Sequence, residues 1–157
     1  MRRACTTLAA TLLLLGCSSG GGGAARPAAG PASGTAPSAA TRTSGVAFVG
    51  QDLPLEQVLA QAQSSGKPAL LCFLAGWCGY CRMLESQTLS DPSVGAHLAA
   101  YTVARYDADT PTGRALVKRY GISGFPTLVR VDAQGNKDAA YEGFDLPADF
   151  VRRVPRP

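Results

Sequence analysis

The fold of this chain can be inferred from one segment, which reads Ala69-Leu70-Leu71-Cys72-Phe73-Leu74-Ala75-Gly76-Trp77-Cys78-Gly79-Tyr80-Cys81. Its first six residues form a continuous apolar run, which is typical of a strand buried on both faces in a parallel sheet. Helix-compatible residues then continue from the second cysteine of the C-x-x-C motif to about residue 89. The segment therefore predicts a buried strand that leads through two cysteines into a helix.

Sequence patterns on either side of this unit predict the remaining elements. Helices are expected at residues 53–64, 91–99, 111–120 and 146–154, and strands at 101–106, 127–131 and 139–142. A β–α–β unit followed by a hairpin and a helix indicates an α/β architecture, here a central mixed sheet flanked by helices. Residues 46–157 are numerous enough to form one domain with a single hydrophobic core.

The position of the C-x-x-C motif between a strand and a helix gives its cysteines different chemistry. Cys78 is expected among the unpaired N–H groups of the helix N-terminus, which favour a thiolate over a thiol. Cys81 lies nearly one turn later, where it can form a disulfide with Cys78. We therefore expect Cys78 to attack a disulfide and Cys81 to resolve the mixed disulfide that forms.

Other uses of a C-x-x-C motif fit this sequence less well. A zinc site usually needs a second cysteine or histidine pair, and only Cys72 and His97 remain outside the first 45 residues. His97 is expected on the surface of a helix. Haem attachment needs a histidine directly after the second cysteine, and Arg82 stands there. No metal ligand set is expected, and no cofactor beyond the redox-active pair itself.

Two separated motifs make the sequence similar to the thioredoxin family. These motifs are Trp77-Cys78-Gly79-Tyr80-Cys81 and Gly121-Ile122-Ser123-Gly124-Phe125-Pro126-Thr127. The resemblance covers nearly all of residues 46–154 and implies a thioredoxin-like fold. It further implies a cis peptide bond at Pro126, which would face Cys78, and a Phe125 backbone that pairs with an extended substrate segment. Trp77, Gly79 and Tyr80 would support the two cysteines, and Gly143 resembles a glycine beside the active site.

The sequence departs from thioredoxins proper at two positions. Cys72 stands where they carry a buried acid, and it is either a core residue or a third thiol able to trap or tune the pair. Gly79-Tyr80 replaces the usual Gly-Pro, as bulky residues do in periplasmic relatives. Glu85 resembles an acid in the C-terminal thioredoxin-like domain of the membrane reductase DsbD. It is either the local acid for Cys81 or a solvated helix residue.

The N-terminal residues are typical of an export signal. A short basic region, Met1-Arg2-Arg3, precedes 12 uncharged residues, too few to span a bilayer. Leu14-Leu15-Gly16-Cys17 then resembles the lipobox of bacterial lipoproteins, in which the cysteine becomes the lipid-modified first residue. The alternative is an ordinary secretory signal that contains a cysteine. Residues 1–16 are therefore expected to be a lipoprotein signal peptide, with Cys17 as the lipidation site.

Residues 17–45 are expected to be a flexible linker. Of the 28 residues from 18 to 45, 23 are Gly, Ala, Ser or Pro, and none is a large apolar residue. A coil of this length has a root-mean-square span of about 30 Å. Four of the 15 basic residues precede residue 46, so 11 basic residues balance 11 acidic ones in the domain. The net charge of +4 therefore indicates no nucleic-acid partner.

Together these features predict a membrane-anchored thiol–disulfide oxidoreductase of the bacterial cell envelope, facing the periplasm or the cell exterior. The resemblance to DsbD favours reduction of protein disulfides, with electrons from a membrane donor of the DsbD type. An oxidase or isomerase of the same fold remains open, since the reduction potential decides the direction. A copper-binding lipoprotein that uses Cys78 and Cys81 as soft ligands also remains open.

Overall fold

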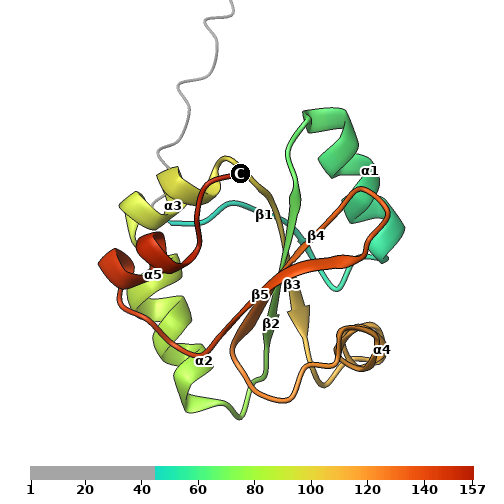
Figure 1. The fold of residues 1–157 in the computed structure, drawn as a ribbon. Helices are drawn as coiled ribbons and strands as arrows, with labels where there is room; N and C mark the ends of the chain where they lie inside the picture. The colour runs from blue at the N-terminus through green and yellow to red at the C-terminus, as the bar shows by residue number, and fades with distance from the viewer. Residues whose placement is uncertain (1–44) are drawn as a thin grey trace, which may run out of the picture. The chain divides into compact units, whose positions relative to one another are not determined.

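The computed structural model describes residues 45–157 as one α/β domain built on a five-stranded sheet (Figure 1). The expected signal peptide, Cys17 and all but the last residue of the expected linker lie outside the described residues. The strands are β1 (Phe48–Gln51), β2 (Ala69–Leu74), β3 (Thr102–Asp107), β4 (Thr127–Val131) and β5 (Lys137–Glu142). The helices are α1 (Leu55–Ser65), α2 (Gly79–Met83), the π-helix η1 (Leu84–Leu89), α3 (Pro92–Leu98), α4 (Pro111–Tyr120) and α5 (Pro147–Arg153).

The sheet is mixed, with β2 at its centre. The strand order is β1-β3-β2-β4-β5, in which β2 pairs parallel with β3 and antiparallel with β4. All six residues of β2 are buried, as expected for a strand with neighbours on both sides and helices on both faces. The predicted fold class is therefore confirmed.

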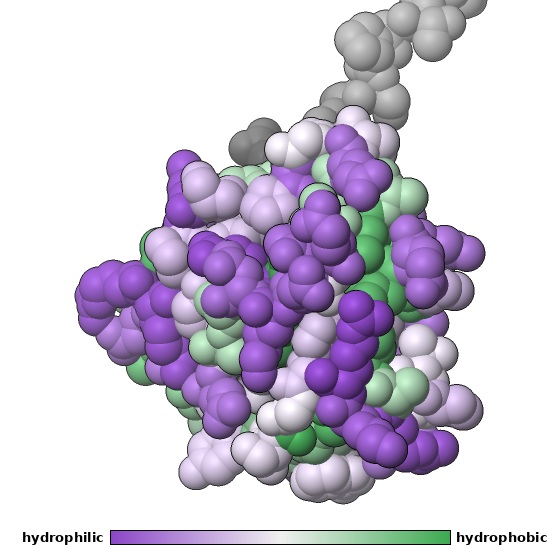
Figure 2. All heavy atoms as spheres, turned by 45° about the vertical axis from the view of Figure 1, so that its right-hand side comes forward, coloured by the Kyte–Doolittle hydropathy of each residue, from purple (hydrophilic) through white to green (hydrophobic). Residues whose placement is uncertain are grey.

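The side chains of β2 point alternately to the two faces of the sheet, and the core is accordingly divided into two clusters. Leu70, Cys72 and Leu74 face one cluster, to which α2, η1, α3 and α5 contribute. Leu71 and Phe73 face the other cluster, which α1 and α4 cover. Figure 2 shows the side of the domain that carries α1 and α4, where hydrophilic side chains cover most of the surface. The helix that carries the cysteines therefore packs on one face of β2, and α1 and α4 pack on the other.

Most predicted elements lie within two residues of their observed bounds. The strands at 69–74 and 127–131 and the helix at 111–120 are confirmed at both ends. Helix α4 ends at Gly121, whose left-handed conformation (φ 63°) suits a residue without a Cβ. Strand β1 was not predicted. It is a short edge strand that pairs only with β3 and leaves most of its side chains exposed, so no burial pattern marks it.

The expectation that His97 lies on a helix surface is wrong. Its side chain is buried, and Nε2 lies 2.6 Å from the carbonyl oxygen of Val154. The Tyr101 hydroxyl donates a second hydrogen bond, of 2.5 Å, to the carbonyl of Pro155. These contacts hold the end of the chain against α3, and sequence spacing gives no sign of them because they join residues more than 50 positions apart.

Candidate active site

The two cysteines of the C-x-x-C motif lie at the start of α2, as predicted. Cys78 is the N-cap residue of this helix, and the backbone N–H of Cys81 donates to its Sγ at 3.1 Å. The two residues are joined by a disulfide, with Cα atoms 5.2 Å apart. Cys78 retains 7% exposure and Cys81 only 1%, so Cys78 is the sulfur that a partner reaches first.

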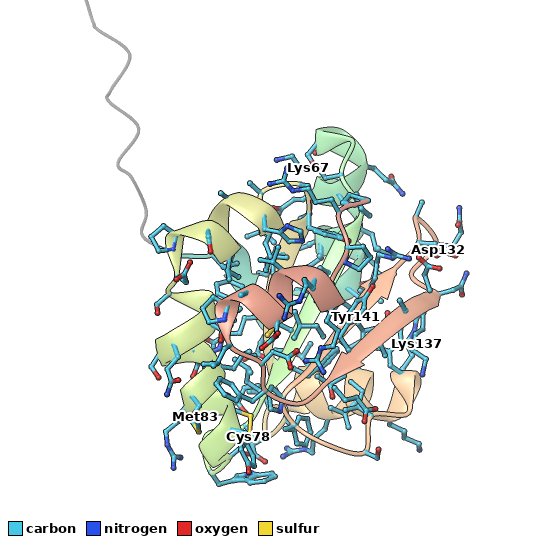
Figure 3. All side chains as sticks on the ribbon, turned by 60° about the vertical axis from the view of Figure 1, so that its left-hand side comes forward. Lys67, Cys78, Met83, Asp132, Lys137 and Tyr141 are labelled. Atoms are coloured by element: carbon cyan, nitrogen blue, oxygen red, sulfur yellow. A yellow bond between two sulfur atoms is a disulfide. The ribbon has the colours of Figure 1, made fainter. Side chains whose placement is uncertain are left out.

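Exposed aromatic and apolar side chains surround the disulfide. Trp77 and Tyr80 are 67% and 64% exposed, and Met83 on the next turn is also exposed. Figure 3 shows Cys78 and Met83 at the same end of the molecule, away from Lys67 and Asp132. Large apolar side chains that remain in solvent mark an interaction surface. This surface is therefore suited to contact another polypeptide.

The loop before β4 lies against the disulfide. The Phe125–Pro126 peptide bond is cis, which confirms the expectation for Pro126. The carbonyl oxygen of Phe125 lies 3.5 Å from Cys78 Sγ, and the Phe125 ring contacts the edge of Trp77 at a centroid distance of 5.9 Å. The structure thus brings together Trp77, Cys78, Phe125 and Pro126, which are up to 49 positions apart in the sequence.

Cys72 is a free thiol in the same buried cluster as the disulfide. Burial raises the pKa of this thiol to about 12, although the nearby Arg105 guanidinium acts in the opposite direction. Cys72 is therefore a neutral thiol at neutral pH. Its role as a third thiol remains a prediction.

Glu85 lies on η1 and forms an ion pair with Arg105 of β3, with Nη2 and Oε1 2.8 Å apart. Arg105 pairs with Cys72 across the two central strands, and both charged groups act on the Cys72 thiol. Each charged side chain is about one-third exposed. Glu85 is thus held by a cation near the Cys72 thiol, and its role as the local acid for Cys81 remains a prediction.

Of the residues that support the Pro126 loop from behind, the sequence analysis singled out Gly143 alone and missed Arg153 and Thr88. The backbone N–H of Gly143 donates to the carbonyl of Pro126 at 2.8 Å. Arg153 and Thr88 in turn hold the loop that contains Gly143. Their contacts are with backbone carbonyls, which any residue offers, so no sequence signal indicates them.

Residues 45–157 are the part of the chain that the structure describes. Within this range, no three His, Cys, Asp or Glu residues are grouped so that they could hold a metal ion. No helix in the same range has the length and apolar character needed to cross a membrane. A hollow of about 850 Å³ between α1 and α3 contains none of the residues around the disulfide.

Comparison with known proteins places this geometry in a family. Residues 55–154 match the sequence model of the thioredoxin-like domain. DsbD, the thiol:disulfide interchange protein of Vibrio vulnificus, is 34% identical over 122 residues, which cover 74% of this chain and 21% of the relative. DsbD 1 of Pseudomonas aeruginosa is 42% identical over 77 residues, covering 48% of this chain and 13% of the relative. The chain therefore spans about a fifth or less of the length of these relatives.

Solved structures give the same result. A thioredoxin from Thermus thermophilus is 34% identical with a TM-score of 0.57, over 63% of this chain and 79% of the other. The oxidised DsbD C-terminal domain of Neisseria meningitidis is 27% identical with a TM-score of 0.54, over 61% of this chain and 85% of the other. From the matched domain, the mixed sheet and the disulfide at the start of α2, we conclude that the chain belongs to the thioredoxin-like family of thiol–disulfide oxidoreductases.

Proposed function

We propose that this chain is a membrane-anchored, extracytoplasmic oxidoreductase that reduces protein disulfides through Cys78 and Cys81. The observation that carries the proposal is the pairing of a partly accessible N-cap cysteine with a buried second cysteine, next to the cis-Pro126 loop. Backbone N–H groups and the dipole at a helix start stabilise a thiolate on Cys78. The buried Cys81 then remains available for the second step.

The reaction proceeds in two exchanges that conserve atoms and electrons. In the reduced protein, the Cys78 thiolate attacks one sulfur of the substrate disulfide, and the other substrate sulfur leaves as a thiolate that takes a proton. Cys81 then loses its proton and attacks Cys78 Sγ, which releases the second substrate thiol. The substrate gains two electrons and two protons, and the Cys78–Cys81 disulfide forms. A donor dithiol must return the electrons, and we propose a membrane donor of the DsbD type.

The surface beside the disulfide supports a polypeptide substrate. Trp77 and Tyr80 offer exposed aromatic contact area, and the Phe125 carbonyl lies next to Cys78 Sγ. An extended segment that pairs with the Phe125 backbone would present its disulfide to Cys78. Phe125 and Pro126 are thus assigned to substrate positioning.

The anchor and the location rest on residues outside the described part. The apolar run that ends at Gly16-Cys17 resembles a lipoprotein signal, and the Gly/Ala/Ser/Pro composition of residues 18–45 suits a tether. Similarity to DsbD proteins supports an extracytoplasmic site of action. Lipid attached at Cys17 would keep the domain at a membrane without a spanning helix.

Insulin reduction and redox titration test the proposal together. We expect a reduction potential closer to the value of about −270 mV for thioredoxin than to the value of about −120 mV for the oxidant DsbA. Cys78→Ser should abolish insulin reduction, whereas Cys81→Ser should accumulate mixed disulfides with substrates. A potential near that of DsbA would support an oxidase, and full activity of Cys78→Ser would refute the assigned nucleophile.

A further inference from the structure

Arg153, near the end of α5, makes three contacts with one loop. Its Nη1 donates to the carbonyl of Glu142 at 2.6 Å, and its Nη2 donates to the carbonyl of Gly143 at 3.1 Å. The same guanidinium forms an ion pair with the Asp145 carboxylate. A planar guanidinium can hold several acceptors in fixed directions at once. Arg153 therefore fixes the path of the chain between β5 and α5.

This loop is bonded directly to the active-site proline. The N–H of Gly143 donates to the Pro126 carbonyl at 2.8 Å, and Glu142 is the strand partner of Thr127. From the other side, the Thr88 hydroxyl of η1 donates to the Asp145 carbonyl at 2.5 Å. The loop thus lies between η1, which follows the cysteines, and the carbonyl of Pro126.

The space beside Gly143 is open. This glycine has a φ of 88°, and a Cβ built on it would meet no atom of the protein within 4 Å. The direction in which a side chain would project from Gly143 is therefore free, whereas Arg153 covers the carbonyl side of this backbone. A substrate segment that pairs with the Phe125 backbone would meet no side chain of residue 143.

We propose that Arg153 is a positioning residue for polypeptide substrates, acting through the Gly143–Pro126 hydrogen bond. This inference rests on the proposed reduction of protein disulfides. Loss of Arg153 would leave two loop carbonyls and the Asp145 carboxylate without their cation. The loop would then hold the Pro126 peptide less firmly, and the backbone edge that receives the substrate would move. A small disulfide needs only access to Cys78 Sγ, so its reduction does not depend on this edge.

The test compares two substrates in two neighbouring variants. Arg153→Met should raise KM for insulin, with kcat/KM falling about tenfold, because bonds between a charged donor and backbone acceptors are lost. The rate at which oxidised glutathione is reduced should stay within about twofold of wild type. The reduction potential of the Cys78–Cys81 couple should stay within about 10 mV of wild type. The control is Arg152→Met, since Arg152 is 74% exposed and pairs with Asp149 on its own helix. This control should match wild type with both substrates.

A second variant still tests the proposal if Arg153→Met folds poorly. Arg153→Lys retains a cation for Asp145 but loses the planar guanidinium that reaches the carbonyls of Glu142 and Gly143. This variant should therefore fold and still raise KM for insulin. Unchanged insulin kinetics in both Arg153 variants would overturn the proposal. Equal losses with insulin and glutathione would also overturn it, because they would indicate an effect on Cys78 itself. If the wild-type protein reduces neither substrate, the proposed function fails and the role of Arg153 fails with it.

Discussion

At the scale of single residues, three cysteines share one buried cluster but differ in chemistry. Cys78 caps a helix and is reachable from solvent, Cys81 lies behind it, and Cys72 is enclosed in the central strand. The sequence spacing predicted the roles of Cys78 and Cys81, because helix geometry relates positions three apart. The state of Cys72 required the structure, since its burial depends on strands that are distant in sequence.

The raised pKa of Cys72 predicts a pH dependence of folding stability. Below about pH 9 the thiol is protonated in both the folded and the unfolded chain, so it does not make the free energy of unfolding depend on pH. Between about pH 9 and 12 the unfolded chain loses this proton first, and stability should fall by up to about 1.4 kcal/mol per pH unit.

Urea unfolding from pH 8 to 10.5 measures this effect in a Cys78→Ser/Cys81→Ser background, which prevents disulfide exchange within the domain. Adding Cys72→Ala should flatten the fall in stability above pH 9. Parallel pH curves for the two proteins would show that Cys72 ionises equally easily in the folded and the unfolded state.

At the scale of elements, the ion pair between Glu85 and Arg105 ties η1 to β3 beside the buried thiols. Both side chains are about one-third exposed, so the pair contributes less than about 1 kcal/mol to stability. We propose that the pair acts in catalysis, with the Glu85 carboxylate accepting the proton that Cys81 must lose.

Glu85→Gln should therefore slow the release of substrate from the mixed disulfide by about tenfold or more, with little change in unfolding free energy. Quenched-flow trapping of the mixed disulfide measures this step. The matched control is Gln87→Ala, an exposed position on the same turn. Wild-type release in Glu85→Gln would leave the pair with a structural role alone.

Elements differ in how far sequence predicts them. Strand β2 and helix α4 have strong sequence patterns. Strand β2 is an unbroken apolar run, and α4 has helical apolar spacing with a proline at its start and a glycine directly after its end. The π-helical turn η1 has no such pattern, because its residues also suit an α-helix. The Arg153 contacts depend on the loop between β5 and α5, whose path follows from packing. The sequence thus predicted the cysteines, the proline and the residues next to them in the two motifs, but not the contacts of Arg153 and Thr88 that hold the Gly143 loop.

At the scale of the whole molecule, the proposed lipid anchor predicts where the protein is found in cells. Cys17→Ala removes the thiol that would carry the lipid, so the protein should move from the membrane fraction to the soluble extracytoplasmic fraction. Fractionation followed by immunoblotting measures this shift. Insulin reduction by the released protein should match wild type, since the variant leaves residues 46–157 unchanged. Retention in the membrane fraction would refute the anchor.

The helical run from α2 through η1 separates the reactive sulfur from Val46, at the start of the domain. Cys78 caps its start, whereas the N–H of Val46 donates to Leu89 at its end. Eleven residues at about 1.5 Å each place these points roughly 16 Å apart. A bead or label attached at Val46 would therefore lie at the opposite end of this helical run from the disulfide, and would leave Cys78 open to a partner.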